Sequence, residues 1–189
     1  MFAAASPWVQ RFLPLIPRGP LPVLDLACGE GRHLRLLIGQ GYKATGLDKR
    51  ITGLADILGE PALELIQRDL EDGSDWPLAG RQFGGVIITN YLHRPLFPNI
   101  IDVISPGGVL IYETFMVGHE RIGRPSSPAY LLEPGELLTA FGERLQVVAF
   151  EQGEVSSPRQ AVVQRIVARA PSPDNLPTTL PSSGANSPW

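Results

Sequence analysis

The sequence contains a single cysteine, Cys28, among its 189 residues. No disulfide bond can therefore form within the chain, and a small domain held together by disulfides is excluded. A protein without disulfides fits a reducing compartment, so we expect it to be cytoplasmic.

Long apolar runs and an excess of positive charge are also missing. No stretch approaches the roughly 18 consecutive apolar residues of a membrane-spanning helix. The opening residues MFAAASPWVQRF lack the basic region that begins a signal peptide. The 16 Lys and Arg residues are outnumbered by 19 Asp and Glu residues, which gives a net charge of −3. We therefore expect no membrane partner, and the charge disfavours a nucleic acid.

Several catalytic and metal-binding signatures are absent as well. The sequence has neither GxSxG, the nucleophile turn of many hydrolases, nor the phosphate-binding loop GxxxxGK[ST]. Its three histidines, His33, His93 and His119, show no zinc-ligand spacing such as HxxxH. We expect no bound metal ion.

The sequence does contain an alternation of β and α patterns. Apolar, strand-like runs are predicted at 22–27, 43–48, 63–69, 84–90, 109–115, 144–151 and 161–170. Helices are predicted at 31–41, 50–59, 99–105 and 133–141, the third stopping at the PGG turn of 106–108. Strands that alternate with helices indicate right-handed βαβ units and a parallel sheet.

Only the last two predicted strands have no helix between them. The nine residues 152–160 suit a hairpin, so the last strand should run antiparallel. The prediction is an α/β fold with a doubly wound, seven-stranded, mostly parallel sheet that ends in an antiparallel hairpin. It occupies one domain, 1–170, with an N-terminal helix over about 6–14. Residues 171–189 hold five prolines and are expected to form a disordered tail.

The stretch VLDLACGEGRH, residues 23–33, joins the first strand to the first crossover helix. Gly29 and Gly31 let the backbone turn sharply and approach a ligand closely. The helix that follows presents unpaired N–H groups at its start. In a doubly wound sheet, ligands bind beyond the carboxyl ends of the strands, so this loop is the expected cradle.

Acidic residues end the next two strands. Asp48, in GLDKR, lies 23 residues after Asp25, and Asp69 ends the third strand in QRDLED. A carboxylate about 20 residues past such a loop can accept hydrogen bonds from both ribose hydroxyls of a nucleotide. Ordinary capping acids are the alternative interpretation of each.

The kind of nucleotide is indicated by two departures from the nicotinamide pattern GxGxxG. The third glycine is replaced by Leu34. Asp25 stands just before the loop, where its charge would oppose a pyrophosphate but would suit a cationic amine. S-adenosylmethionine has an amine, a sulfonium, a ribose and an adenine but no phosphate, and it fits the pattern better.

The stretch VLDLACGEGRH resembles motif I of the class I S-adenosylmethionine-dependent methyltransferases, and the resemblance covers roughly residues 6–170. It includes GLDKR, RDLED, TNYLHRP and PGGVLIYETF after or within the later strands. Within that family the chain is most similar to small bacterial enzymes of the tellurite-resistance type, which share a CGxGRH-like loop. One departure is Ala27, where many members have glycine.

The resemblance implies a Rossmann-like methyltransferase fold, S-adenosylmethionine as cofactor, and roles for matching residues. Asp25 and the backbone of Ala27, Cys28, Gly29 and Gly31 would hold the methionine moiety. Asp48 would accept hydrogen bonds from the ribose hydroxyls, with Lys49 beside them. Asp69 would face the adenine amine, with Leu70 against the adenine ring. Asn90 and Tyr91 would border the methyl group.

Acceptor-side residues must lie after the fourth and fifth strands. His93 is the candidate general base, with Tyr91 the second candidate catalytic residue. A long loop that could act as a lid follows the fifth strand and contains His119, Arg121 and Arg124. Together with Arg94, these residues suggest that the acceptor is anionic. The alternative interpretation is a solvated loop without a binding role. Glu113 interrupts the fifth strand and could anchor a lid arginine or orient the acceptor.

The sequence thus predicts a methyltransferase that acts on a small-molecule partner. Three alternatives stay open: an RNA or protein methyltransferase, an NAD(P)-dependent oxidoreductase, and a non-catalytic S-adenosylmethionine binder. Leu34 and the terminal hairpin disfavour the oxidoreductase.

Overall fold

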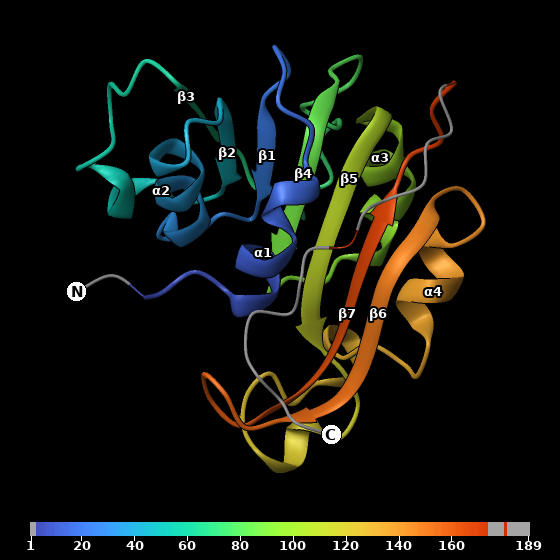
Figure 1. Ribbon diagram of the computed structural model, residues 1–189. Helices are drawn as coiled ribbons and strands as arrows, with labels where there is room; N and C mark the ends of the chain where they lie inside the picture. Colours follow the sequence, from blue (N-terminus) through green and yellow to red (C-terminus); the bar gives the residue numbers. More distant parts are fainter. Residues whose placement is uncertain (1–2, 174–179, 181–189) are drawn as a thin grey trace, which may run out of the picture.

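The computed structural model describes residues 3–173 and residue 180. The described strands form one seven-stranded sheet in the order β3-β2-β1-β4-β5-β7-β6 (Figure 1). Strands β1 to β5 pair in parallel, and β7 runs antiparallel to both β5 and β6, which confirms the predicted sheet. The strands are β1 (Val23–Leu26), β2 (Ala44–Asp48), β3 (Leu63–Gln67), β4 (Phe83–Thr89), β5 (Ile104–Phe115), β6 (Gln146–Val155) and β7 (Ala161–Arg169).

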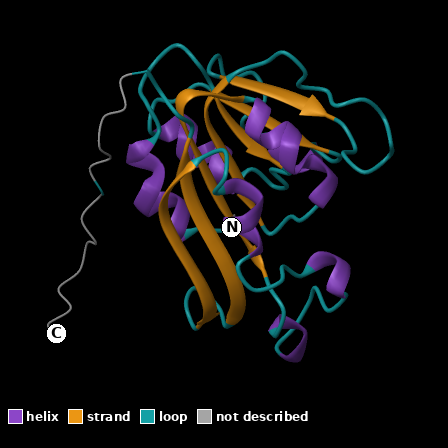
Figure 2. Cartoon of the chain, turned by 90° about the vertical axis from the view of Figure 1, so that its right-hand side faces the viewer, coloured by secondary structure: helices purple, strands orange, loops and turns teal. Residues whose placement is uncertain are grey.

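Helices cover both faces of the sheet (Figures 1 and 2). Trp8 and Phe12 of one helix and Leu34 of a second pack in one apolar cluster, whereas Ile100 and Phe141 belong to a cluster on the other face. Because both faces are covered, β1 and β4 are almost continuously apolar. The helices are α1 (Pro7–Phe12), α2 (Arg32–Gly39), α3 (Phe97–Asp102) and α4 (Glu136–Phe141).

The helix predicted at 50–59 is wrong. Only a 3-10 turn, Thr52–Leu54, forms there. Gly53 and Gly59 disfavour a helix by their conformational entropy, and only Leu54 and Ile57 are buried in this segment. Two buried side chains are too few to outweigh that cost by packing.

Other boundaries shift by a few residues. The predicted helix over about 6–14 ends at Phe12 and continues as a 3-10 turn, Leu13–Leu15. Strand β5 begins at Ile104, so the predicted PGG turn lies within the strand. Strand β6 begins two residues later and ends four residues later than predicted, β7 ends one residue earlier, and the link between them is 156–160.

The predicted tail, 171–189, lies mostly outside the described residues, and the domain limits 1–170 stay a prediction. In the part of the chain that the structure describes, no helix has the length and apolar character needed to cross a bilayer.

The strand order reverses between β1 and β4, which places their carboxyl ends side by side. Leu26 pairs with Ile88, so the loops after the two strands begin next to each other. A crevice opens at such a switch point because the two loops leave in opposite directions. This is where the site is assembled.

Candidate ligand-binding site

The loop after β1, residues 27–31, bends through three left-handed residues: Ala27 at φ 56°, Gly29 at φ 53° and Gly31 at φ 72°. A Cβ on Gly29 would meet no atom within 4 Å, whereas one on Gly31 would strike Leu54. Gly31 is therefore needed for packing, and Gly29 leaves its backbone open toward the crevice. A non-glycine residue at positive φ, as at Ala27, is uncommon and costs strain, which is typical of functional sites.

Asp48 is joined directly to this loop. Its Oδ2 accepts a hydrogen bond from the Gly29 N–H at 2.8 Å, and its Oδ1 accepts one from the Arg50 N–H at 2.9 Å. The carboxylate is thus held beside the loop while its remaining lone pairs stay available to a ligand.

Asp48 also lines a cavity of about 160 Å³. We call it the Asp48 cavity. Asp69, two residues past the end of β3, also lines it, and its Oδ1 accepts from the Glu71 N–H at 3.0 Å. Six of the predicted site residues meet here, since the lining consists of Ala27, Asp48, Lys49, Arg68, Asp69, Leu70, Glu71 and Tyr91.

Asp25 lies beneath the loop and is only 1% exposed. Its Oδ1 is 3.8 Å from Nδ1 of His33, and its Oδ2 has no hydrogen-bond partner in the described structure. His33 Nε2 accepts from the Ser6 N–H at 3.1 Å, which assigns the proton of a neutral ring to Nδ1, facing Asp25. His33 is therefore a buried link between α2 and the N-terminal segment.

Cys28 is buried in the same loop. Burial raises the pKa of its thiol, and the charges of Asp25 and Asp48 raise it further. A thiol in this setting stays protonated and unreactive, as expected for a packing residue.

Asn90 follows β4 at φ 55° and lies at the centre of the crevice. It lines three cavities: one of about 300 Å³ with Gly29, one of about 440 Å³ with Glu113 and one of about 200 Å³ with Tyr91. Burial raises the pKa of Tyr91, and Glu71 raises it further, so its phenol is neutral near pH 7. A neutral phenol can contact a ligand but is a poor base.

The predicted acceptor-side residues do not come together. Arg94 donates to Glu136 at 2.6 and 2.9 Å and to the carbonyls of Ala129 and Leu131 at 3.0 and 2.9 Å. All of its bonds are internal, and it ties the loop after β4 to α4. His93 is half-buried, and its side chain makes no hydrogen bond with the described residues.

His119 is buried and stacks on Phe115 with ring centroids 4.2 Å apart. Its Nδ1 accepts from the Val162 N–H at 3.3 Å, and Nε2 lies 3.1 Å from the Arg124 carbonyl, so both nitrogens are engaged within the fold. Arg121 and Arg124 are exposed, and neither lines the cavities around Asn90. Roles for these residues in binding an acceptor stay predictions.

The 440 Å³ cavity holds the residues that sequence reasoning missed. We call it the Glu113 cavity, after the carboxylate in its wall; Glu113 and Asn90 are the candidates there that the sequence did single out. Glu113 accepts from Ser6 Oγ at 2.9 Å and pairs with Arg165 Nε at 2.8 Å, so its partner belongs to β7 and not to a lid. Only the fold brings together its polar lining, which comprises Ser6, Gln10, Arg32, Asn90, Glu113, Arg159 and Arg165.

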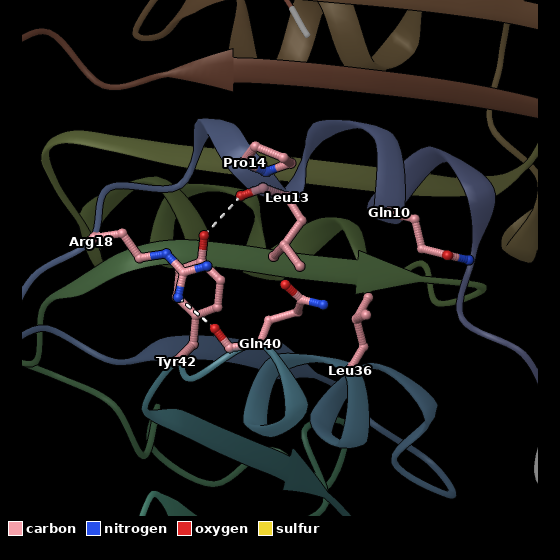
Figure 3. A pocket seen from close by; sticks show the side chains of 7 residues that line it. All are labelled: Gln10, Leu13, Pro14, Arg18, Leu36, Gln40 and Tyr42. Atoms are coloured by element: carbon pink, nitrogen blue, oxygen red, sulfur yellow. Dashed lines mark hydrogen bonds between the residues drawn. The ribbon is translucent and has the colours of Figure 1, made fainter. Parts of the chain in front are cut away.

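A separate cavity of about 290 Å³ lies between the N-terminal helical segment and the end of α2 (Figure 3). Arg18 lies over the Tyr42 ring at 3.8 Å and donates to the Gln40 carbonyl at 2.6 Å. None of the predicted site residues lines this cavity. Among the described residues, no cluster of three His, Cys, Asp or Glu side chains could hold a metal ion.

The sequence matches no protein-family model and no curated protein. Solved structures are similar. TehB from Haemophilus influenzae, a tellurite-resistance protein, aligns at TM-score 0.66 and 17% identity over 86% of this chain and 61% of TehB, so this chain spans less than two thirds of it. An S-adenosylmethionine-dependent methyltransferase from Methanosarcina mazei aligns at 0.68 and 15% identity over 90% of this chain and 100% of the other.

The glycopeptide N-methyltransferase MtfA, in complex with S-adenosylhomocysteine, aligns at TM-score 0.62 and 18% identity over 90% of this chain and 91% of its own. These similarities agree with the seven-stranded, mostly parallel sheet described above. The chain has the fold of the class I S-adenosylmethionine-dependent methyltransferases.

Proposed function

We propose that the protein is an S-adenosylmethionine-dependent methyltransferase that acts on a small, anionic molecule. The observation that carries the proposal is the convergence of the open Gly29 backbone, the Asp48 carboxylate and the unpaired Oδ2 of Asp25 at one switch point. A buried carboxylate oxygen without a partner is costly unless a donor or a cation reaches it. The amine of the methionine moiety offers such a group.

The cavities fit the other parts of the cofactor. Asp48 would accept from the ribose hydroxyls beside Lys49, and the Asp48 cavity would take the adenine, with Asp69 near its amine and Leu70 against its ring. The bound cofactor supplies a methyl group on a positively charged sulfur. Asn90 would border that methyl group, because it lines both the cavity beside the glycine loop and the Glu113 cavity.

The protein's task in methyl transfer is then mainly alignment. The Glu113 cavity, which adjoins Asn90, is the proposed seat of the acceptor. His93 stays the candidate base and Tyr91 a candidate contact to the reacting groups. An RNA or protein acceptor is a less favoured alternative, as are an NAD(P)-dependent oxidoreductase and a non-catalytic binder. With one buried thiol and no disulfide, we also propose a cytoplasmic location.

Calorimetry with S-adenosylhomocysteine and NADH tests the cofactor. We expect micromolar binding of S-adenosylhomocysteine and none of NADH, and the reverse result would overturn the proposal. Asp48→Ala should weaken binding about tenfold or more, because it removes a charged hydrogen-bond acceptor from the loop. Asp72→Ala is the matched control, since the hydrogen bonds that Asp72 accepts come from the nearby Ser74 and it lines none of these cavities.

Turnover separates an enzyme from a binder. Whole cell extract is incubated with the protein and methyl-labelled cofactor, and the labelled products are sorted by size. Label in small molecules is the expected result. Label only in RNA or protein would identify the alternative acceptors, and binding without any label would indicate the non-catalytic binder.

A further inference from the structure

We infer that the Glu113 cavity binds the anionic group of an acceptor through Arg32 and Arg159, with the rest of the acceptor on the apolar wall. The inference rests on the proposed function and names the class of acceptor and the residues that select it. Sequence reasoning placed this role on Arg94, Arg121 and Arg124 instead.

The charge of the cavity is the first observation. The chain as a whole carries a net charge of −3. The charged residues that line this cavity are three arginines, Arg32, Arg159 and Arg165, against one carboxylate, Glu113. The cavity is therefore a positive region on an acidic protein, and such a region concentrates anions.

Pairing is the second observation, since it decides which arginines are available. Arg165 is neutralised by Glu113 at 2.8 Å and lies 3.5 Å from Glu151. Arg32 donates only to neutral oxygens, Thr89 Oγ1 at 3.1 Å and the Ala4 carbonyl at 3.5 Å.

Arg159 lies over the Phe115 ring, 5.3 Å from its centroid, and pairs with no carboxylate among the described residues. The acidic residue nearest in sequence, Glu154, accepts instead from Gln160 at 2.7 Å. Two guanidinium groups thus line the cavity without a counter-charge. A guanidinium offers a planar set of donors that suits a carboxylate or a phosphate.

The apolar lining is the third observation and describes the rest of the acceptor. Phe115, Val155, Pro158, Ala161 and Val163 line the cavity beside the arginines. An apolar wall with a few placed charges is typical of a site for a small organic molecule. Arg32 also lines the glycine-loop side of Asn90, so an acceptor held there lies next to the proposed position of the methyl group.

Benzoate, phenyl phosphate and the neutral benzamide are suitable probes, each titrated into protein saturated with S-adenosylhomocysteine. We expect benzoate or phenyl phosphate to bind about tenfold or more tightly than benzamide, because a charge-assisted bond to arginine is lost in the amide. The tighter of the two anions identifies the acceptor's anionic group. Equal binding of all three probes would overturn the inference.

Variants then locate the effect. Arg159→Gln and Arg32→Gln should each reduce the preference for the anion about fivefold to tenfold while leaving benzamide binding unchanged. Arg144→Gln changes an exposed arginine that lines none of these cavities, so it is the matched control and should behave as the parent protein. Anion binding that persists in the Arg32→Gln/Arg159→Gln double variant would overturn the inference.

The same titrations separate this inference from the proposed function. Suppose that the parent protein does not bind S-adenosylhomocysteine but still prefers the anionic probes, and that Arg159→Gln removes this preference. That result would overturn the proposed cofactor and support the anion site. Normal cofactor binding without any anion preference would overturn the anion site and leave the methyltransferase in place.

Discussion

Asp25 and Cys28 lie three residues apart at the carboxyl end of β1, and both are buried. The apolar surroundings keep an ionisable thiol neutral, because removal of a thiolate from water is unfavourable. The same surroundings make the unpaired Oδ2 of Asp25 costly in the absence of a ligand. At this scale the loop combines a thiol that stays protonated with a carboxylate that the amine of the proposed cofactor would pair.

Cys28 should therefore resist alkylation in the folded protein. Burial raises its pKa, with Asp25 and Asp48 adding to the effect, so the thiolate is scarce at pH 8. With iodoacetamide at pH 8, we expect labelling about a hundredfold or more slower than that of free glutathione. The control is the same protein in urea, which should take up one label per chain; rapid stoichiometric labelling of the native chain would contradict the prediction.

Among the elements, the loop after β4 is held to α4 by the Arg94–Glu136 pair. Burial raises the pKa of Glu136, but the hydrogen bonds from Arg94 and the Glu133 N–H, with the charge of Arg94, outweigh it and lower the pKa below its usual 4.5. A folded-state pKa below the unfolded value means stability that is present above pH 4.5. It is lost as the pH falls through the folded-state value.

Glu136→Gln should cost about 1 kcal/mol of unfolding free energy at pH 7, since the pair is only partly buried. The difference from the parent protein should shrink as the pH falls below about 4.5, where the parent also loses the charge. Urea unfolding at several pH values measures it. Glu143 is exposed and has no ion pair in the described structure, so Glu143→Gln should leave the free energy of unfolding almost unchanged at any pH. If Glu136→Gln lowered the free energy of unfolding equally at every pH, the argument would be refuted.

In the whole molecule, the N-terminal segment connects distant parts of the chain. Ser6 caps α1 by accepting from the N–H groups of Trp8 and Val9, and its Oγ donates to Glu113, 107 residues away. Its own N–H donates to His33, beside Asp25. One residue thus links the start of the chain to α2 and to the carboxyl end of β5.

Ser6→Ala should reduce the unfolding free energy by about 1–2 kcal/mol, because a helix cap is lost and Glu113 loses a donor. Urea unfolding followed by circular dichroism measures this cost. Ser127→Ala is the matched control, since Ser127 precedes a 3-10 turn without a side-chain cap, and it should change the stability by less than about 0.5 kcal/mol. Equal effects of the two substitutions would show that the Ser6 contacts do not stabilise the fold.

The sequence predicts the sheet because its signals are local. Apolar runs of strand length, the glycine turn after β1 and the missing helix before β7 indicate the topology without knowledge of any tertiary contact. The Asp48 cavity could be predicted for a related reason. In a parallel sheet the ends of neighbouring strands meet at one edge, so Asp48 and Asp69 necessarily come close to the glycine loop.

The segment 50–59 and the acceptor side are different. Whether a weak helical pattern such as 50–59 forms is decided by how much of it the fold buries, and here little is buried. Arg94 and His119 were reasonable candidates by position, but a side chain's availability depends on partners such as Glu136 and the Val162 N–H that sequence spacing does not reveal.

The sequence by itself determined the α/β architecture. It also determined which residues stand in the glycine loop, at the ends of the strands and at the start of α2. These features depend on residues close in sequence or on the fixed geometry of a parallel sheet. Only the tertiary structure decided the Glu113 cavity. Its arginines come from α2, β7 and the hairpin link, and its walls include the N-terminal segment. Which of those charges are cancelled and which stay open to a ligand depends on contacts between residues far apart in sequence, such as the ion pair between Glu113 and Arg165.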